Sequence, residues 1–124
     1  MIDFKNGAVF KLKRNPSITN APLVSPLLTE GELYIAEYKT IRDFVVFTNK
    51  RIIAVNVQGV TGKKKDFTTL PYSKIQAFSV ETAGMLDFDS ELELYFSGLG
   101  KVRFEFIGES DIIAIGKLIS ERIL

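Results

Sequence analysis

The sequence predicts a mainly β domain: a seven-stranded sandwich or partly open barrel, capped by one C-terminal α-helix. Two observations lead to this prediction. Between residues 32 and 106 the apolar residues alternate or cluster in runs of strand length, and glycine, asparagine and aspartate separate the runs. From residue 109 onward they recur with the period of a helix, so one amphipathic helix is expected to cover an open end of the sheets.

Composition bounds the function. The chain has 124 residues, the size of one domain, and contains neither cysteine nor histidine. The lack of cysteine excludes disulfides, thiolate zinc sites and cysteine nucleophiles, and the lack of histidine removes the commonest metal ligand and general base. We therefore expect no enzyme activity, no catalytic residues, no metal site and no cofactor, although carboxylates alone remain possible in principle.

Residues 1–26 are interpreted as an N-terminal arm, and residues 27–124 as the domain. AVFKLK (8–13) has the alternation of a short amphipathic strand. Prolines at positions 16, 22 and 26 then favour an extended or turn-rich path, because each removes a backbone donor and restricts its neighbour. No apolar run approaches a signal peptide or the ~20 residues of a membrane helix, so we expect a soluble, cytoplasmic protein.

Three strands in quick succession form the predicted first meander. They are ELYIAEYKTI (32–41), DFVVFTN (43–49) and RIIAVNVQ (51–58), with tight turns at Arg42-Asp43 and Asn49-Lys50. FVVF and IIAV are apolar at consecutive positions, so both faces of these strands are expected to be covered. One helix cannot easily hide so much apolar surface, and the remainder is expected to form an interface between subunits.

The segment GVTGKKK (59–65) raises the question of a phosphate-binding loop. A Walker loop requires G-x-x-x-x-G-K-[ST] before a helix, whereas the glycines here are three apart and the following DFTTLPY is not helical. The glycines instead predict positive φ angles in a long hairpin. DFTTL (66–70), Pro71 and a further strand, KIQAFSVET (74–82), follow.

The clearest alternation lies in ELELYFS (91–97) and KVRFEF (101–106), which predict a hairpin through Gly98-Leu99-Gly100. The loop AGMLDFDS (83–90) precedes it. Glu93 is expected opposite Arg103 as a cross-strand pair.

The last segment, ESDIIAIGKLISERIL (109–124), predicts the helix. Ile112, Ile115, Ile119 and Ile123 share one face with Gly116, which permits close approach to a sheet or is merely tolerated. Ser110 is the expected cap, and Asp111 suits the first turn.

Charge is unevenly distributed, although the net charge is only +1. Residues 39–65 hold seven basic residues against Asp43 alone, and residues 66–98 hold six acidic residues against Lys74 alone. The candidate residues for binding an anion or a partner are Lys39, Arg42, Lys50, Arg51, Lys63, Lys64 and Lys65. The candidate acidic interface consists of Glu81, Asp87, Asp89 and Glu91. The spacing of the last three is similar to half a calcium loop, but glycine at the sixth position and the distal glutamate are missing.

Several segments together resemble the bacterial pleckstrin-homology-like family. They are LLTEGE (27–32), RDFVVFTNKRII (42–53), QGVTGKKKDF (58–67), PYSKIQAFSVETAG (71–84) and LDFDSELEL (86–94). The resemblance covers about residues 23–124 and implies seven strands in two bent sheets, with one end closed by the C-terminal helix. It also implies assembly as a ring of identical subunits, while no common ligand or reaction defines the family.

Two functions stay open. The first is a non-enzymatic, ring-forming scaffold or protein-interaction domain, in which the acidic stretch of one subunit meets the basic stretch of the next. The alternative is a module that binds an anionic lipid headgroup or phosphate through residues 39–65. YKTIRDFVV lacks the alternating basic residues that lipid-binding pleckstrin-homology domains carry along their first hairpin, and the basic set is divided if its second turn opens at the other end. Nucleic acid is not expected, because no helix carries the basic stretch.

Overall fold

The structure, a computed structural model, describes residues 1–4, 9–108 and 111–124. Within them the strands are β1 (Val9–Arg14), β2 (Tyr34–Lys39), β3 (Phe44–Thr48), β4 (Arg51–Gln58), β5 (Lys64–Pro71), β6 (Ile75–Glu81), β7 (Ser90–Phe96) and β8 (Gly100–Phe106). The helices are α1 (Ala21–Val24) and α2 (Ile112–Ile123), and 3₁₀ turns span Ser25–Leu27 and Tyr72–Lys74. The predicted mainly β fold with a C-terminal helix is confirmed. The described strands number eight rather than seven, because Val9–Arg14 adds one.

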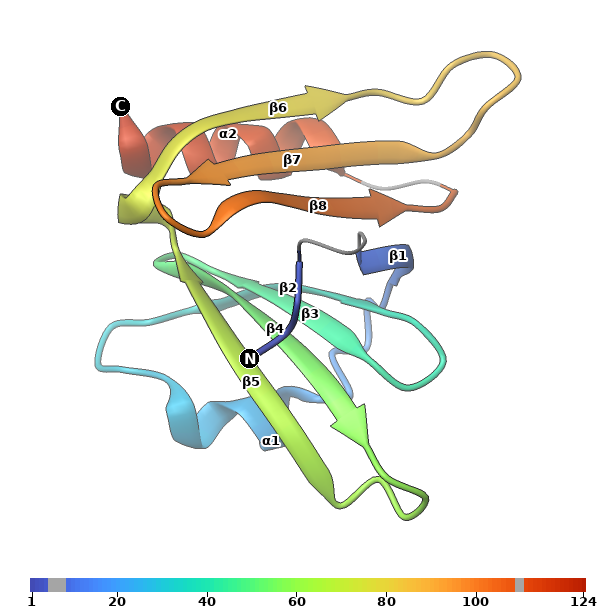
Figure 1. Cartoon of the computed structure of the whole chain (residues 1–124), viewed down its shortest axis with the longest axis vertical. Coiled ribbons are helices and arrows are strands. Elements are labelled where there is room, and N and C mark those ends of the chain that lie inside the picture. The colour runs from blue at the N-terminus through green and yellow to red at the C-terminus, as the bar shows by residue number, and fades with distance from the viewer. Residues whose placement is uncertain (5–8, 109–110) are drawn as a thin grey trace.

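Strand β1 joins two halves of one sheet. The strand order is β5-β4-β3-β2-β1-β8-β7-β6, with β1 antiparallel to β2 and parallel to β8. Figure 1 shows the half-sheet β2–β5 facing the half-sheet β6–β8, with β1 between them at one side. Within the described strands the sheet stays open, since β5 and β6 are its two edges.

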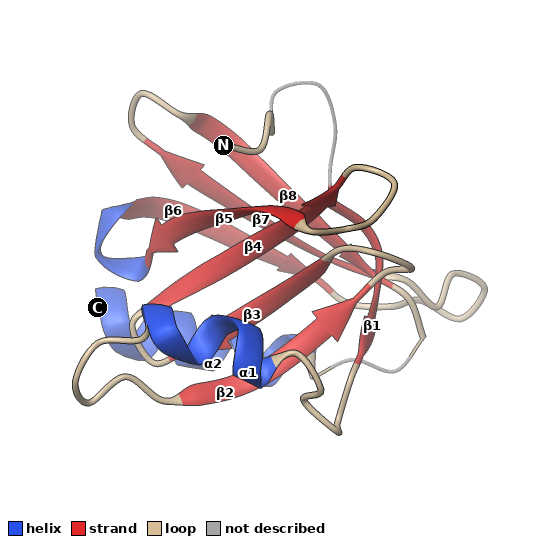
Figure 2. Ribbon diagram, turned by 90° about the horizontal axis from the view of Figure 1, so that it is seen from below, coloured by secondary structure: helices blue, strands red, loops and turns tan. Residues whose placement is uncertain are grey.

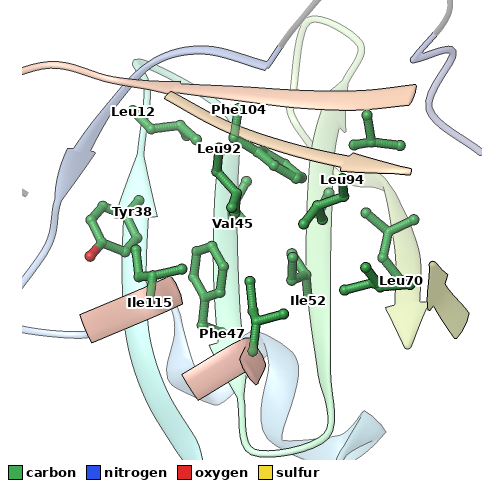
Figure 3. Packing of buried hydrophobic residues seen from close by; sticks show 14 of the residues in the cluster. Leu12, Tyr38, Val45, Phe47, Ile52, Leu70, Leu92, Leu94, Phe104 and Ile115 are labelled. Atoms are coloured by element: carbon green, nitrogen blue, oxygen red, sulfur yellow. The ribbon is translucent and has the colours of Figure 1, made fainter. Parts of the chain in front are cut away.

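The main core fills the space between the two half-sheets. Figure 3 shows side chains of the two halves meeting in this space, with Leu92 and Phe104 of one half above Val45 and Phe47 of the other. The ring of Tyr38 packs edge-on against that of Phe106, with centroids 4.9 Å apart. Helix α2 closes one end of this core with three buried isoleucines, Ile112, Ile115 and Ile119. The predicted apolar face of the helix is therefore its buried face.

A second, smaller core covers the outer face of β3 and β4. Val24 of α1 packs there with Phe44, Val46, Ile53 and Val55, and Figure 2 shows α1 lying across this half-sheet. All five residues of β3 are buried. The expectation that both faces are covered is confirmed. The expectation that part of this surface remains for a subunit interface is wrong for these strands, because the chain covers it with its own residues.

The proline-rich segment forms this cover as helical turns. Pro22 stands at the start of α1, and Pro26 stands at the start of the following 3₁₀ turn. Proline fits these positions because a helix leaves its first N–H groups unbonded and needs the φ angle that proline fixes. The segment is thus turn-rich rather than extended.

Helix α2 approaches β6 at Gly116. A Cβ atom at this position would lie 3.0 Å from Val80 Cγ2, so of the two roles that the sequence left open the glycine permits close approach. Ser110, the expected cap, lies outside the described residues. Asp111 occupies the N-cap position rather than the first turn, and its carboxylate accepts a hydrogen bond from Arg14 Nη1 at 2.9 Å.

Gly116→Leu tests this contact. We expect it to lower the free energy of unfolding by about 1–3 kcal/mol, because the added side chain must displace Val80 or Phe78. Lys117→Leu, at the next and exposed position of the same helix, is the control and should change stability by less than about 0.5 kcal/mol. Equal stability of both variants by urea denaturation would contradict the close packing.

Candidate functional site

The structure places the candidate basic residues at two opposite ends of the β2–β5 half-sheet. The β2–β3 turn (40–43) and the β4–β5 turn (59–63) lie side by side, and the guanidinium of Arg42 donates a hydrogen bond to the Gly59 carbonyl oxygen. We call this end the loop end. The β3–β4 turn (49–50) lies at the other end, since β3 and β4 are antiparallel. The basic set is therefore divided.

Lys50 and Arg51, at the far end, are engaged within the chain. The Lys50 ammonium donates to the Glu30 carbonyl oxygen at 3.0 Å. The guanidinium of Arg51 donates to Glu32 at 2.8 Å and to the Leu27 carbonyl oxygen at 2.7 Å. These contacts tie the segment before β2 to the β3–β4 turn.

Glu32 is a buried carboxylate, with a side chain only 1% exposed. Burial alone would raise the pKa of Glu32. Hydrogen bonds from Arg51, the Thr29 backbone and the Thr48 hydroxyl outweigh that effect and lower the pKa to about 2. Arg51 was a candidate for binding an anion or a partner, because nothing in local spacing indicates that its partner lies 19 residues away in the same chain.

Glu37, in β2, is a second buried carboxylate and is fully shielded from solvent. It accepts hydrogen bonds from the side chains of Asn15, Asn20 and Tyr34, and its Oε1 also accepts one from the Asn20 backbone at 3.1 Å. These bonds fix the segment before α1 on the sheet. The sequence analysis did not detect this network, since glutamate inside a strand usually points to solvent.

At the loop end, Lys39, Arg42, Lys63 and Lys64 are exposed. The Lys65 ammonium donates to the Gly62 carbonyl oxygen at 2.8 Å and stays half-buried. Gly59 and Gly62 have φ angles of 77° and 68°, which confirms the predicted turn. Lys64–Pro71 continues as β5 rather than a helix, so the loop has no Walker geometry.

Two apolar side chains protrude at the tips of these turns. Ile41 and Val60 are as exposed as in an extended chain, at 102% and 104%. The Arg42 bond to Gly59 holds their two turns together. The loop end thus combines apolar tips with a cluster of cations.

A groove of ≈ 500 Å³ lies beside Ile41. It is lined mostly by apolar atoms, and its residues are Lys11, Lys13, Lys39, Thr40, Ile41 and Ile107. Of its three lysines the sequence analysis identified only Lys39. Lys11 and Lys13 belong to the segment interpreted as an arm, and only the pairing of β1 with β2 brings them here.

Among the residues that the structure describes, no acidic group neutralises the three lysines of the groove. Lys13 lies directly opposite Lys39 in the β1–β2 register, where like charges destabilise each other. Lys11 has a φ of 54°, an unusual angle for a residue other than glycine, beside a register shift in β1. Within the described part of the chain, none of the three ammonium groups has a hydrogen bond or ion pair.

The candidate acidic residues gather on the β6–β7 hairpin. Glu81 lies opposite Glu91, and Glu91 lies opposite Glu105 on β8. Burial raises the pKa of Glu91, and Arg103, at 3.6 Å, opposes that shift while the neighbouring glutamates add to it. Among the described residues, no three acidic side chains form a group that could hold a metal ion.

The predicted pair across the last hairpin is corrected in one respect. Glu93 and Arg103 are opposite in register, as expected, but the ion pairs run diagonally. Arg103 pairs with Glu91, and Glu93 pairs with Lys101 at 3.5 Å. The diagonal neighbours on a twisted hairpin are within reach of long side chains.

The β6–β7 loop (82–89) projects beyond the strands, as Figure 1 shows at its upper right. Met85, Leu86 and Phe88 are 91%, 97% and 68% exposed. Asp87 stands between the last two, and its carbonyl oxygen accepts a hydrogen bond from the Gly84 N–H at 2.7 Å. The loop therefore presents three large apolar side chains around a turn that also contains the acidic side chain of Asp87.

The chain matches the bacterial PH domain model over residues 3–123. It belongs to this family. It is 47% identical to the uncharacterized protein YjqA of Bacillus subtilis (strain 168) over 96 residues, which cover 76% of this chain and 77% of that protein.

Solved structures agree with the family. A DUF1696 family protein with a pleckstrin-homology domain from Shewanella loihica PV-4 is 37% identical, with a TM-score of 0.77 over 92% of this chain and 98% of that one. A pleckstrin homology domain from Shewanella amazonensis SB2B is 42% identical, with a TM-score of 0.63 over 84% and 85% of the two chains. The resemblance to this family and its fold is confirmed.

The lowered pKa of Glu32 predicts a specific pH dependence. Glu32→Gln should lower the free energy of unfolding by roughly 3 kcal/mol at neutral pH, because it removes the charge that Arg51 stabilises. A carboxyl whose pKa is lowered by folding contributes this stability above its unfolded pKa and loses it as pH falls through the folded pKa. The difference from wild type should therefore shrink between about pH 5 and about pH 2.

Urea denaturation across this pH range measures the effect. Glu30→Gln is the control, since Glu30 is exposed and its contact with Lys50 uses only the backbone oxygen. It should show little effect at any pH. A deficit of Glu32→Gln that stays constant down to about pH 2 would contradict the assignment.

Proposed function

We propose that this chain is a non-enzymatic interaction domain that serves as a scaffold by assembling with copies of itself, in a closed ring. The observation that carries the proposal is the β6–β7 loop, with Met85, Leu86 and Phe88 turned to solvent. A cluster of large apolar side chains held outside the core is typical of a protein interface. A contact between two different patches, repeated from subunit to subunit, closes into a ring when the rotation permits.

Charge supports the same proposal. The exposed lysines and Arg42 of the loop end have the opposite sign to the acidic β6–β7 hairpin. Such complementarity steers association and fixes its register, while each exposed pair adds only about 0–1 kcal/mol. The apolar side chains therefore provide most of the affinity, and the charges provide orientation.

Asp43 and Asn56, which line a second hollow of the molecule, have structural partners. This hollow of ≈ 470 Å³ lies between the N-terminal residues and strands β3 and β4. The carboxylate of Asp43 inside it accepts hydrogen bonds from the Asn56 side chain at 3.3 Å and the Val57 backbone at 2.9 Å. Asp43 thus anchors the β2–β3 turn to β4, which favours a structural role over a general base.

Light scattering after size exclusion tests the assembly. We expect a discrete particle whose mass is a multiple of 13.9 kDa, and a shift toward smaller species in high salt, because screening weakens the charged part of the contact. A monomer of 13.9 kDa at every concentration and salt level would contradict the proposed scaffold.

A second candidate function is docking to an anionic membrane surface, and the loop end favours it. Ile41 and Val60 protrude from adjacent turns, and Lys39, Arg42, Lys63 and Lys64 flank them. Apolar tips can enter the interface of a bilayer while the cations meet anionic headgroups. Lysine and arginine bind the phosphate as a point charge and as a fork, respectively.

Vesicle flotation tests this candidate. Wild type should float with vesicles that contain phosphatidylserine and not with phosphatidylcholine alone, and Lys63→Glu/Lys64→Glu should weaken binding at least about tenfold, at ~1 kcal/mol per lysine. Lys74→Glu/Lys117→Glu, which changes the net charge equally at two other exposed positions, should float like wild type. If wild type never floats, or if both double variants fail alike, the site is not at the loop end.

A further inference from the structure

We infer that the groove beside Ile41 receives the β6–β7 loop of a second copy of this chain. The inference rests on the proposed self-assembly and names its contact. Residues 85–88 of one copy would enter the groove that Lys11, Lys13, Lys39, Thr40, Ile41 and Ile107 line in the next.

The groove and the β6–β7 loop both present apolar surface. The groove has a mostly apolar lining and a volume of ≈ 500 Å³, within the ~300–1,000 Å³ of ligand pockets, which suits side chains better than a single ion. Leu86 and Met85 are almost fully exposed. The chain's own loop therefore does not fill its own groove, and a second copy can supply the missing apolar contacts.

The groove is basic and the β6–β7 loop is acidic. Lys13 and Lys39 lie opposite each other across β1 and β2, and neither ammonium group has a hydrogen bond or ion pair among residues 1–4, 9–108 and 111–124. A carboxylate placed between two such ammonium groups turns a repulsion into two attractions. Asp87 is flanked by Leu86 and Phe88, so the loop delivers an acidic group together with its apolar side chains.

Hydrogen bonds within the β6–β7 loop fix its conformation. The Gly84 N–H bonds to the Asp87 carbonyl oxygen at 2.7 Å, and the Asp89 N–H bonds to an Asp87 carboxylate oxygen at 3.0 Å. Both bonds hold the turn that carries Leu86 and Phe88. A pre-organised loop loses less conformational entropy on binding than a free segment does.

An anionic membrane suits this loop less well. Its own carboxylates, Asp87 and Asp89, and the adjacent row of glutamates would be repelled by a negatively charged bilayer. A basic groove on another copy has the sign that the loop requires. Since each copy carries both partners, the contact can repeat around a ring or be exchanged about a two-fold axis.

Charge exchange tests the contact directly. The groove variant is Lys13→Glu/Lys39→Glu, and the loop variant is Asp87→Lys/Asp89→Lys. Each variant alone has groove and loop of the same sign and should be monomeric by light scattering. Their equimolar mixture should assemble again, because the basic loop of one variant fits the acidic groove of the other.

A neutral pair of variants guards against loss of folding. Leu86→Ser changes a side chain that is 97% exposed, and we expect at least a tenfold increase in the concentration at which the assembly dissociates. Ile113→Ser, at a position 67% exposed on α2, is the matched control and should leave the assembly unchanged. Equal effects of the two substitutions would overturn the inference.

The outcomes separate this inference from the proposed function. If wild type assembles and both charge variants assemble equally well, self-assembly stands but its contact lies elsewhere. If wild type is monomeric, the proposed function fails as well. If the groove variant keeps its assembly but no longer floats with phosphatidylserine vesicles, the groove is a lipid site, and the inference is overturned.

Discussion

Strands β3 and β4 are apolar on both faces, and the need to bury both faces determines the arrangement of the rest of the molecule. One face lies in the main core, beneath β7, β8 and α2. The other face is covered by α1 and the turn after it. This cover is held by two buried carboxylates: Glu37 binds the segment before α1, and Glu32 binds Arg51 beneath the segment after it. Buried carboxylates are costly unless fully hydrogen-bonded, so they fix the cover in one position.

This constraint also decides where the domain can meet a partner. Because the chain buries both faces of β3 and β4, the sheet offers no large apolar face there. Apart from the terminal Met1 and Leu124, the most exposed large apolar side chains of the described residues lie instead in the β2–β3 and β4–β5 turns and in the β6–β7 loop. The lysines of the groove beside Ile41 and the acidic hairpin lie next to these connections. Recognition is therefore expected at loops held by a rigid scaffold, as is usual for binding proteins.

Local pattern was sufficient for most of the fold. The strands and the positive φ angles of the turn glycines follow from spacing over a few residues. Three features depend on contacts between distant residues and could not be read in this way. The prolines of residues 16–26 left an extended path open where the chain forms the short helix α1. The ion pair of Arg51 with Glu32 joins segments that are separate in the sequence. Lys13 lies beside Lys39 only because β1 pairs with β2. The predicted basic set therefore differs from the one that the structure brings together. Lys50 and Arg51 were included but are engaged within the chain, and Lys11 and Lys13 were not included.

Amide hydrogen exchange tests most directly whether copies of this chain meet at the groove and the β6–β7 loop. The wild-type protein is measured at concentrations well below and well above the concentration at which it assembles. We expect slower exchange to appear on assembly in residues 39–42 and 84–89, at the groove and the β6–β7 loop. Strand β3 should exchange at the same rate in both samples, because the chain itself already covers it. New protection confined to the edge strand β5, with no change at the groove or the loop, would contradict the account.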